Sequence, residues 1–175
     1  MALGEVLFTA DQIAERVAQL AAEIRRDLAG RPLTIVGVLR GSIFFLTDLV
    51  RELGLDATIE LVEAASYGGQ TVASGQVTLR RYGRLEVAGR HVLIVDDIAD
   101  TGNTLAAVRR AVEAMGPASV RVCVLLDKPA RRRAAVDVDY RGFVVGNVFV
   151  VGYGLDYGGR YRSLPYIAAL RKDDP

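Results

Sequence analysis

Hydrophobic and polar positions along the first part of the chain follow the period of an amphipathic helix. Five apolar residues recur at helical spacing: Ile13, Val17, Leu20, Ile24 and Leu28. Thr9 and Gln12, three residues apart, have the capping-box pattern that begins a helix. Gly30 and Pro32 follow the last apolar position, so we expect the helix to end there.

Short apolar runs then alternate with further amphipathic segments. Strands are predicted at 33–38, 57–62, 76–79, from Val92 onward, and at 120–126. Helices are predicted at 42–53, closed by Gly54, and at about 104–115. This alternation predicts an α/β fold with a mostly parallel twisted sheet flanked by helices. Ligands of such folds bind beyond the carboxyl ends of the strands.

The stretch 64–75 breaks this alternation. It is polar and contains glycines, so hydrophobic periodicity cannot place it in a core, and we expect a mobile loop. We find no internal repeat and no linker to a second domain, so one domain is expected over 1–175.

Composition and charge narrow the class of protein. The chain has 175 residues, of which 51% are hydrophobic and 25% charged, which suits a globular protein with a real core. A net charge of +1 gives no bulk attraction to nucleic acid or to an anionic membrane. No apolar run approaches the roughly 18 residues of a spanning helix, and no signal-peptide pattern is present, so we expect a cytoplasmic protein. The single cysteine, Cys123, lies in an apolar run and is expected to be buried.

The strongest candidate site lies where the strand that begins at Val92 ends. Asp96 and Asp97 close the apolar run, and the loop that follows reads Asp100, Thr101, Gly102, Asn103, Thr104. Unpaired N–H groups and the helix dipole at the start of the next helix attract a phosphate, and Gly102 permits the tight turn. Asp96 and Asp97 would repel that phosphate, so ribose hydroxyls or a magnesium ion are their natural partners. The alternative, that these residues only cap the helix, is weakened by three aspartates in five positions.

This segment resembles the phosphoribosyl pyrophosphate motif of type I phosphoribosyltransferases, which is a strand, two acidic residues and then D-T-G-x-T. The stretches 37–42, 66–68 and 149–157, with Tyr161 and Arg162, resemble the hypoxanthine phosphoribosyltransferase family. The likeness runs in order from about residue 5 to residue 170. It implies the type I phosphoribosyltransferase fold, with a small hood from the terminal segments. It also implies that about 127–170 form a hood with the purine pocket.

The resemblance implies an enzyme of purine salvage. Such an enzyme transfers the 5-phosphoribosyl group from phosphoribosyl pyrophosphate to N9 of hypoxanthine or guanine, with Mg²⁺ as cofactor. The products are IMP or GMP and pyrophosphate. The resemblance also implies a homodimer or homotetramer, and we expect no nucleic-acid or membrane partner.

By the same resemblance, the candidate site holds phosphoribosyl pyrophosphate. Asp96 and Asp97 would hold the ribose hydroxyls, directly or as ligands of magnesium. Asp100 would act as general base or acid at purine N7, and the loop 101–104 would bind the 5′-phosphate.

Two further segments match parts of the family's site. Leu39, Arg40 and Gly41 match the pyrophosphate-binding turn, where the family often has a non-proline cis peptide and a lysine in place of Arg40. Arginine keeps the charge of lysine but changes its geometry, so contact through the backbone should survive. Ser66 and Tyr67 match the flexible loop that closes over the site.

The C-terminal third would supply the purine pocket. By resemblance, Lys128 donates to the purine 6-oxo group, Phe149 stacks on the base and the Val150 backbone addresses its edge. Asp156 would bind a second magnesium ion, and Arg162 would reach the pyrophosphate. Without the resemblance, Lys128 fits a solvated loop, Phe149 the core of a strand and Asp156 a turn.

Other interpretations have less support. A non-catalytic regulator that binds phosphoribosyl pyrophosphate on the same fold is the main alternative, although no helix-turn-helix pattern or basic domain supports it. A receiver domain would carry its acidic pair after the first strand and would leave the loop 101–104 without a role. The run 131–133 is predicted to be a solvated face, and a contact between subunits of an oligomer is the more specific alternative. His91 is expected to be structural.

Overall fold

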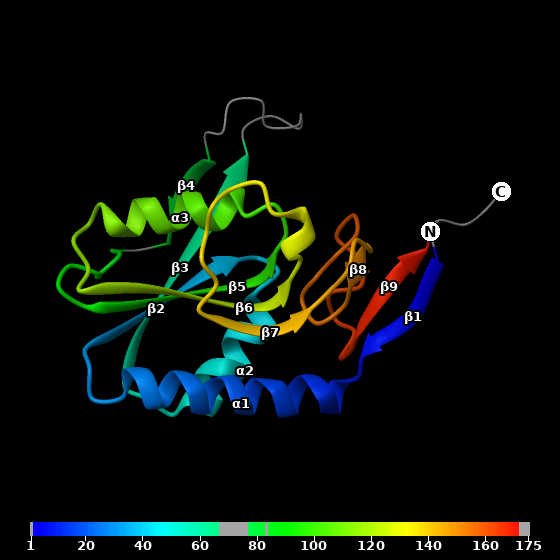
Figure 1. Ribbon diagram of the computed structural model, residues 1–175, viewed down its shortest axis with the longest axis horizontal. Coiled ribbons are helices and arrows are strands. Elements are labelled where there is room, and N and C mark those ends of the chain that lie inside the picture. The colour runs from blue at the N-terminus through cyan, green and yellow to red at the C-terminus, as the bar shows by residue number, and fades with distance from the viewer. Residues whose placement is uncertain (1, 67–76, 83, 172–175) are drawn as a thin grey trace.

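A six-stranded sheet forms the centre of the protein in the computed structural model, which describes residues 2–66, 77–82 and 84–171 (Figure 1). Its strand order is β4-β3-β2-β5-β6-β7. The strands are β2 (Leu33–Leu39), β3 (Ala57–Ser66), β4 (Val77–Arg81), β5 (His91–Ala99), β6 (Ser119–Asp127) and β7 (Tyr140–Val144). All neighbouring pairs are parallel except β3 and β4, which are antiparallel at one edge. The predicted mostly parallel sheet is therefore confirmed.

Helices cover both faces of this sheet. Helices α1 (Ala10–Leu28) and α2 (Ile43–Leu53) lie on one face, and α3 (Asn103–Glu113) lies on the other (Figure 1). Successive residues of β5 point to opposite faces, so Leu93 and Val95 pack with α1 and α2 while Val92 and Ile94 pack with α3. Burial on both faces explains why the strand is an unbroken apolar run.

A second, three-stranded sheet joins the two ends of the chain. It has the order β1-β9-β8, in which β1 (Ala2–Phe8) and β8 (Val150–Val151) both pair antiparallel with β9 (Ile167–Arg171). This is the small hood expected from the terminal segments, and it lies beyond the carboxyl ends of β5 and β6 (Figure 1). The sequence predicted no strand at 2–8, because most of these side chains are exposed and no apolar alternation marks them.

The helix boundaries agree with the sequence signals. Thr9 caps α1, since its Oγ1 accepts from the Gln12 N–H at 3.3 Å while its own N–H donates to Gln12 Oε1 at 2.8 Å. Gly54 ends α2 in the left-handed conformation, with φ of 57°. Cys123 is fully buried and free, and burial raises the pKa of its thiol, as expected of a structural cysteine. Within the described ranges, no helix combines the length and apolar composition needed to span a membrane.

Strands β3 and β5 extend further than the sequence predicted. Residues 64–66, expected in a loop, belong to β3, because they pair with Val77, Thr78 and Leu79 of β4. Residues 67–75, the rest of the predicted loop, lie outside the described residues. Strand β5 continues past Asp97 to Ala99, because Ile98 and Ala99 pair with Leu126 and Asp127 of β6. Backbone pairing of this kind carries no hydrophobic period, so it could not be predicted from the sequence.

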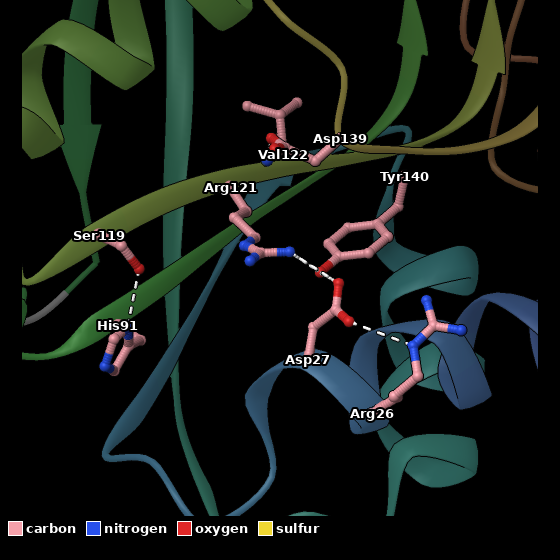
Figure 2. Close-up of polar contacts among 8 residues, drawn as sticks. All are labelled: Arg26, Asp27, His91, Ser119, Arg121, Val122, Asp139 and Tyr140. Atoms are coloured by element: carbon pink, nitrogen blue, oxygen red, sulfur yellow. Dashed lines mark hydrogen bonds and ion pairs between the residues drawn. The ribbon is translucent and has the colours of Figure 1, made fainter.

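A polar cluster ties the end of α1 to strands β6 and β7 (Figure 2). Asp27 accepts hydrogen bonds from Arg121 Nη1 at 2.7 Å and from the Tyr140 hydroxyl at 2.8 Å. The Tyr140 hydrogen bond is the main influence that lowers the pKa of Asp27. Figure 2 also shows His91 bonded to Ser119 at 2.7 Å across β5 and β6, consistent with a structural role for His91.

We expect the stability that Asp27 contributes to depend on pH. Because its pKa is lower in the folded state, the carboxylate stabilises the fold above pH about 4 and this contribution is lost as pH falls through the lowered pKa. Asp27→Asn should lower the midpoint of thermal unfolding at pH 7, and the difference from the wild type should shrink toward pH 3. Asp56→Asn, at an exposed position, is the control. A difference that is the same at both pH values would contradict the expectation.

Candidate functional site

A cleft of about 350 Å³ opens at the carboxyl ends of β2 and β5. Most of the predicted site residues line it: Leu39, Arg40, Gly41, Asp96, Asp97, Asp100, Thr101, Gly102, Thr104, Asp156 and Arg162. Asn103 begins α3 and is exposed outside this lining. Lys128, Phe149 and Val150 lie outside the lining too. Segments far apart in the sequence therefore meet at one edge of the sheet.

The loop before α3 is shaped to accept an anion. Gly102 has φ of 82°, and a Cβ atom there would lie 2.8 Å from Arg132 Cδ and 3.1 Å from the Ala134 carbonyl oxygen. Only glycine fits this position without a shift of its neighbours. In the described part of the chain no side chain caps α3, whose first N–H groups have no acceptor within the helix. With the Thr101 and Thr104 side chains, this helix start suits a phosphate group.

Asp96, which is buried, and Asp97, which is partly buried, form an acidic pair beside this loop. Asp96 is only 6% exposed, and its Oδ1 accepts the Asp97 N–H at 2.9 Å. Burial raises the pKa of both carboxyl groups, and the charge of Asp97 raises that of Asp96 further. The charge of Arg162 acts in the opposite direction on the pKa of Asp97. Two desolvated carboxylates of this kind are stabilised by a cation or by hydroxyl donors.

The chemistry of the acidic pair fits Mg²⁺. Among the described residues, no group of three or more His, Cys, Asp or Glu side chains could hold a metal ion. Mg²⁺ usually binds through one or two carboxylates and completes its shell with water and substrate phosphates. Asp96 and Asp97 therefore meet the requirement of a magnesium ion that arrives with a phosphorylated substrate.

The turn after β2 packs tightly against the acidic pair. The Leu39–Arg40 peptide is cis, as the resemblance implied. A Cβ atom at Gly41 would lie 1.6 Å from Asp97 Oδ2, and one at Gly154 would lie 2.0 Å from the Gly41 carbonyl oxygen. The backbone of the turn is thus contacted by β5 on one side and by the segment after β8 on the other. The Arg40 guanidinium pairs with Glu63 Oε1 at 3.3 Å.

Asp156 and Arg162 face each other at the edge of the cleft. Arg162 Nη2 lies 2.7 Å from Asp156 Oδ1, and Arg162 Nη1 donates to the Gly154 carbonyl oxygen at 2.6 Å. The second carboxylate oxygen of Asp156 accepts the Gly159 N–H at 2.7 Å. One oxygen of Asp156 is thus engaged in an ion pair and the other in a hydrogen bond, so any metal there would share them.

Lys128 is buried, which excludes the solvated loop lysine considered above. Its side chain is 7% exposed, and Nζ donates to the Val148 carbonyl oxygen at 2.6 Å. Nζ also lies 4.0 Å from Asp100 Oδ2. Burial lowers the pKa of Lys128, while the charge of Asp100 acts in the opposite direction. The ammonium group and the Asp100 carboxylate are thus placed to address neighbouring atoms of one ligand.

Phe149 does not belong to a strand core. It is 54% exposed, and its ring meets that of Tyr157 edge to face at a centroid distance of 5.7 Å. Val150 is buried in β8 directly after it. Ser66 ends β3, and Tyr67 lies outside the described residues. An exposed aromatic ring beside a buried lysine offers a stacking surface for a planar ligand.

The prediction that 131–133 form a solvated face is wrong for Arg132, whose side chain is 18% exposed. Arg131 Nε pairs with Asp100 Oδ1 at 2.6 Å, and Arg132 pairs with the buried Asp127. Arg131 and Arg133 keep the expected exposure, although the Arg131 guanidinium is also engaged in an ion pair. A run of three charges has no period that marks which side chain turns inward, so the sequence could not single out Arg132, nor could it show that Arg131 also bonds to Asn147.

Comparisons with known proteins agree with this geometry. Residues 6–158 match the family model of the phosphoribosyl transferase domain. The chain is 46% identical over 174 residues to a hypoxanthine-guanine phosphoribosyltransferase from Mycobacterium avium, covering 96% of this chain and 86% of that protein. A solved hypoxanthine-guanine phosphoribosyltransferase from Bacillus anthracis is 37% identical, with a TM-score of 0.92, covering 97% of this chain and 100% of that chain.

Another group of relatives is longer. The chain is 42% identical over 171 residues to the bifunctional protein TilS/HprT of Listeria innocua, and the match covers 98% of this chain but 26% of that protein. The chain therefore spans about a quarter of the length of this relative.

The packing around Gly41 predicts the effect of a single methyl group. Gly154→Ala would place a Cβ atom 2.0 Å from the Gly41 carbonyl oxygen, at a φ of 100° that strains an L-residue. We expect a loss of about 1–3 kcal/mol in the free energy of unfolding, measured with denaturant. Gly146→Ala is the matched control, because its Cβ would meet nothing within 4 Å. Equal stability of the two variants would contradict the packing described.

Proposed function

The chain belongs to the phosphoribosyltransferase family, and from this premise we propose that it is a hypoxanthine-guanine phosphoribosyltransferase of purine salvage. It transfers the 5-phosphoribosyl group from phosphoribosyl pyrophosphate to N9 of hypoxanthine or guanine, yielding IMP or GMP and pyrophosphate. One observation carries the proposal: an uncapped helix start, a largely buried acidic pair and a buried lysine 4.0 Å from Asp100 meet at one sheet edge. No finding favours the non-catalytic regulator.

Different residues of the cleft bind different parts of the sugar phosphate. The helix start with Thr101 and Thr104 binds the 5′-phosphate, and Asp96 and Asp97 hold the ribose hydroxyls. The contact of Asp96 and Asp97 with these hydroxyls would be direct or through Mg²⁺, which the two carboxylates would hold, and Asp156 is the candidate ligand of a second ion. When bound, magnesium neutralises the charge of the pyrophosphate.

The protein's own donors stabilise the charge that moves during transfer. Negative charge builds on the pyrophosphate as its bond to C1′ breaks, while C1′ gains cationic character. The Arg162 guanidinium and the backbone of the turn at Arg40 and Gly41 lie where they can stabilise the departing group. No protein nucleophile is required.

The purine is recognised beside the cleft. Lys128 donates to the 6-oxo group, and Asp100 acts as general base or acid at N7. Phe149 stacks on the base, and the Val150 backbone contacts its edge. Adenine has an amino group in place of the 6-oxo acceptor, so the buried ammonium would lose its partner, at a cost of about 1–3 kcal/mol. Adenine is therefore a poor substrate.

Location and assembly follow from the same proposal. The enzyme acts in the cytoplasm, as expected for salvage of free bases, and it assembles as a homodimer or a homotetramer. Light scattering coupled to size-exclusion chromatography distinguishes these two assemblies.

Turnover tests the proposed function directly. With phosphoribosyl pyrophosphate and Mg²⁺, guanine and hypoxanthine should be converted to nucleotides, followed by ultraviolet absorbance, whereas adenine should react at least about tenfold less efficiently. Asp100→Ala should lower kcat by about 10²- to 10⁴-fold and retain nucleotide binding, because it removes only the group that moves a proton. Absence of turnover with both bases would refute the function, and a near-normal kcat for Asp100→Ala would refute the role of Asp100.

Lys128 should affect the base more than the sugar phosphate. Lys128→Ala removes the donor to the 6-oxo group, so we expect weaker use of guanine and hypoxanthine by about tenfold or more. Binding of phosphoribosyl pyrophosphate should change little, since the cleft lining does not include Lys128. Isothermal titration with each ligand separately checks this difference. An equal loss of affinity for both ligands would contradict the assignment.

A further inference from the structure

Arg131 contacts Asp100 but has no role in the reaction proposed above. Its Nε donates to Asp100 Oδ1 at 2.6 Å, and its Nη1 donates to Asn147 Oδ1 at 2.8 Å. The planar guanidinium thus holds two oxygens from different segments at once, which a lysine ammonium at the end of a flexible stem does less rigidly. The carboxylate of Asp100 is engaged through one oxygen, and Oδ2 remains on the side of Lys128.

The contacts of Arg131 complete a closed chain of interactions that includes the groups proposed to contact the purine. Asn147 directly precedes Val148, whose carbonyl oxygen accepts from Lys128 Nζ at 2.6 Å. Lys128 Nζ in turn lies 4.0 Å from Asp100 Oδ2. The Arg131 N–H also donates to the Lys128 carbonyl oxygen at 3.0 Å. The proton-transfer group and the 6-oxo donor are therefore held in one frame, and Arg131 is the member that touches both halves of it.

The backbone of the same segment supports the Asp100 loop on both sides. The Lys128 N–H donates to the Ala99 carbonyl oxygen at 3.0 Å, and the Ala134 N–H donates to the Thr101 carbonyl oxygen at 3.0 Å. Asp100 lies between these two anchored carbonyls. The backbone thus fixes the loop, while the rotation of the Asp100 side chain is left to Arg131.

Stability alone does not account for this ion pair. The side chains of Arg131 and Asp100 are 43% and 36% exposed, and exposed ion pairs of this kind contribute little to folding. The pair instead fixes which carboxylate oxygen faces the ligand, and this orientation matters for a group that moves a proton.

We propose that Arg131 is a positioning residue for the transfer reaction: with Asn147 it orients the Asp100 carboxylate so that Oδ2 faces N7 of the purine whose 6-oxo group Lys128 binds. This inference rests on the proposed function. Arg131 itself contacts neither the sugar phosphate nor the reacting atoms, and its effect passes through Asp100.

The test compares Arg131→Gln with the wild type in steady-state turnover of guanine. Arg131→Gln should lower kcat by about tenfold, which is less than the 10²- to 10⁴-fold that general acid-base catalysis supplies in all. The KM for phosphoribosyl pyrophosphate should stay within about twofold, since the cleft lining does not include Arg131. Arg133→Gln, an exposed arginine two residues along, is the matched control and should keep the wild-type kcat.

A second background separates positioning from a general structural effect. Combined with Asp100→Asn, Arg131→Gln should cause no further loss of kcat, because the group it orients has already been disabled. Asn147→Ala should lower kcat in the same direction and should not add to Arg131→Gln. Thermal unfolding of each variant checks that the fold is retained.

The possible results have distinct meanings. A wild-type kcat for Arg131→Gln, a higher kcat, an equal loss in Arg133→Gln or an additive loss in the Asp100→Asn background would each overturn the role of Arg131 while wild-type turnover upholds the proposed function. Absence of turnover in the wild type would refute the proposed function itself, and this inference with it.

Discussion

A Cβ atom at position 41 would lie 1.6 Å from the Asp97 carboxylate, so the turn after β2 and the end of β5 approach each other through a bare backbone. The parallel pairing of β2 with β5 brings these two segments to the same edge of the sheet. Gly154 then closes on the other side of the turn. The cleft depends on this approach, because any side chain at Gly41 would push Asp97 away from the place where the sugar phosphate is proposed to bind.

The sheet that carries this edge is fixed by burial on both of its faces. Strand β5 supplies apolar side chains to two cores in alternation, so its register cannot slip by one residue without exchanging them. Because the register of β5 is fixed, Asp96 and Asp97 have defined positions in the cleft. Desolvation, which raises the pKa of both carboxyl groups, then makes them receptive to a cation or to hydroxyl donors.

Much of this architecture could be predicted from the sequence, because its signals are local. The chemistry of a few neighbouring residues predicts the capping box at Thr9, the apolar strands and the tight turn at Gly102. The extension of β3 and the strand at 2–8 could not, since both depend on backbone pairing with distant segments. Within the site, the acidic pair and its loop followed from the motif, whereas the contact of Arg131 with Asp100 spans 31 residues and left no pattern.

The pairing of β1 with β9 has a consequence for how the protein matures on the ribosome. Every strand of the large sheet is synthesised before β9. The large sheet can therefore assemble while β1 still lacks its pairing partner, β9. The hood, and with it the side of the site where the purine is proposed to bind, is completed last. A nascent chain can therefore hold a folded centre well before it is competent to select a purine.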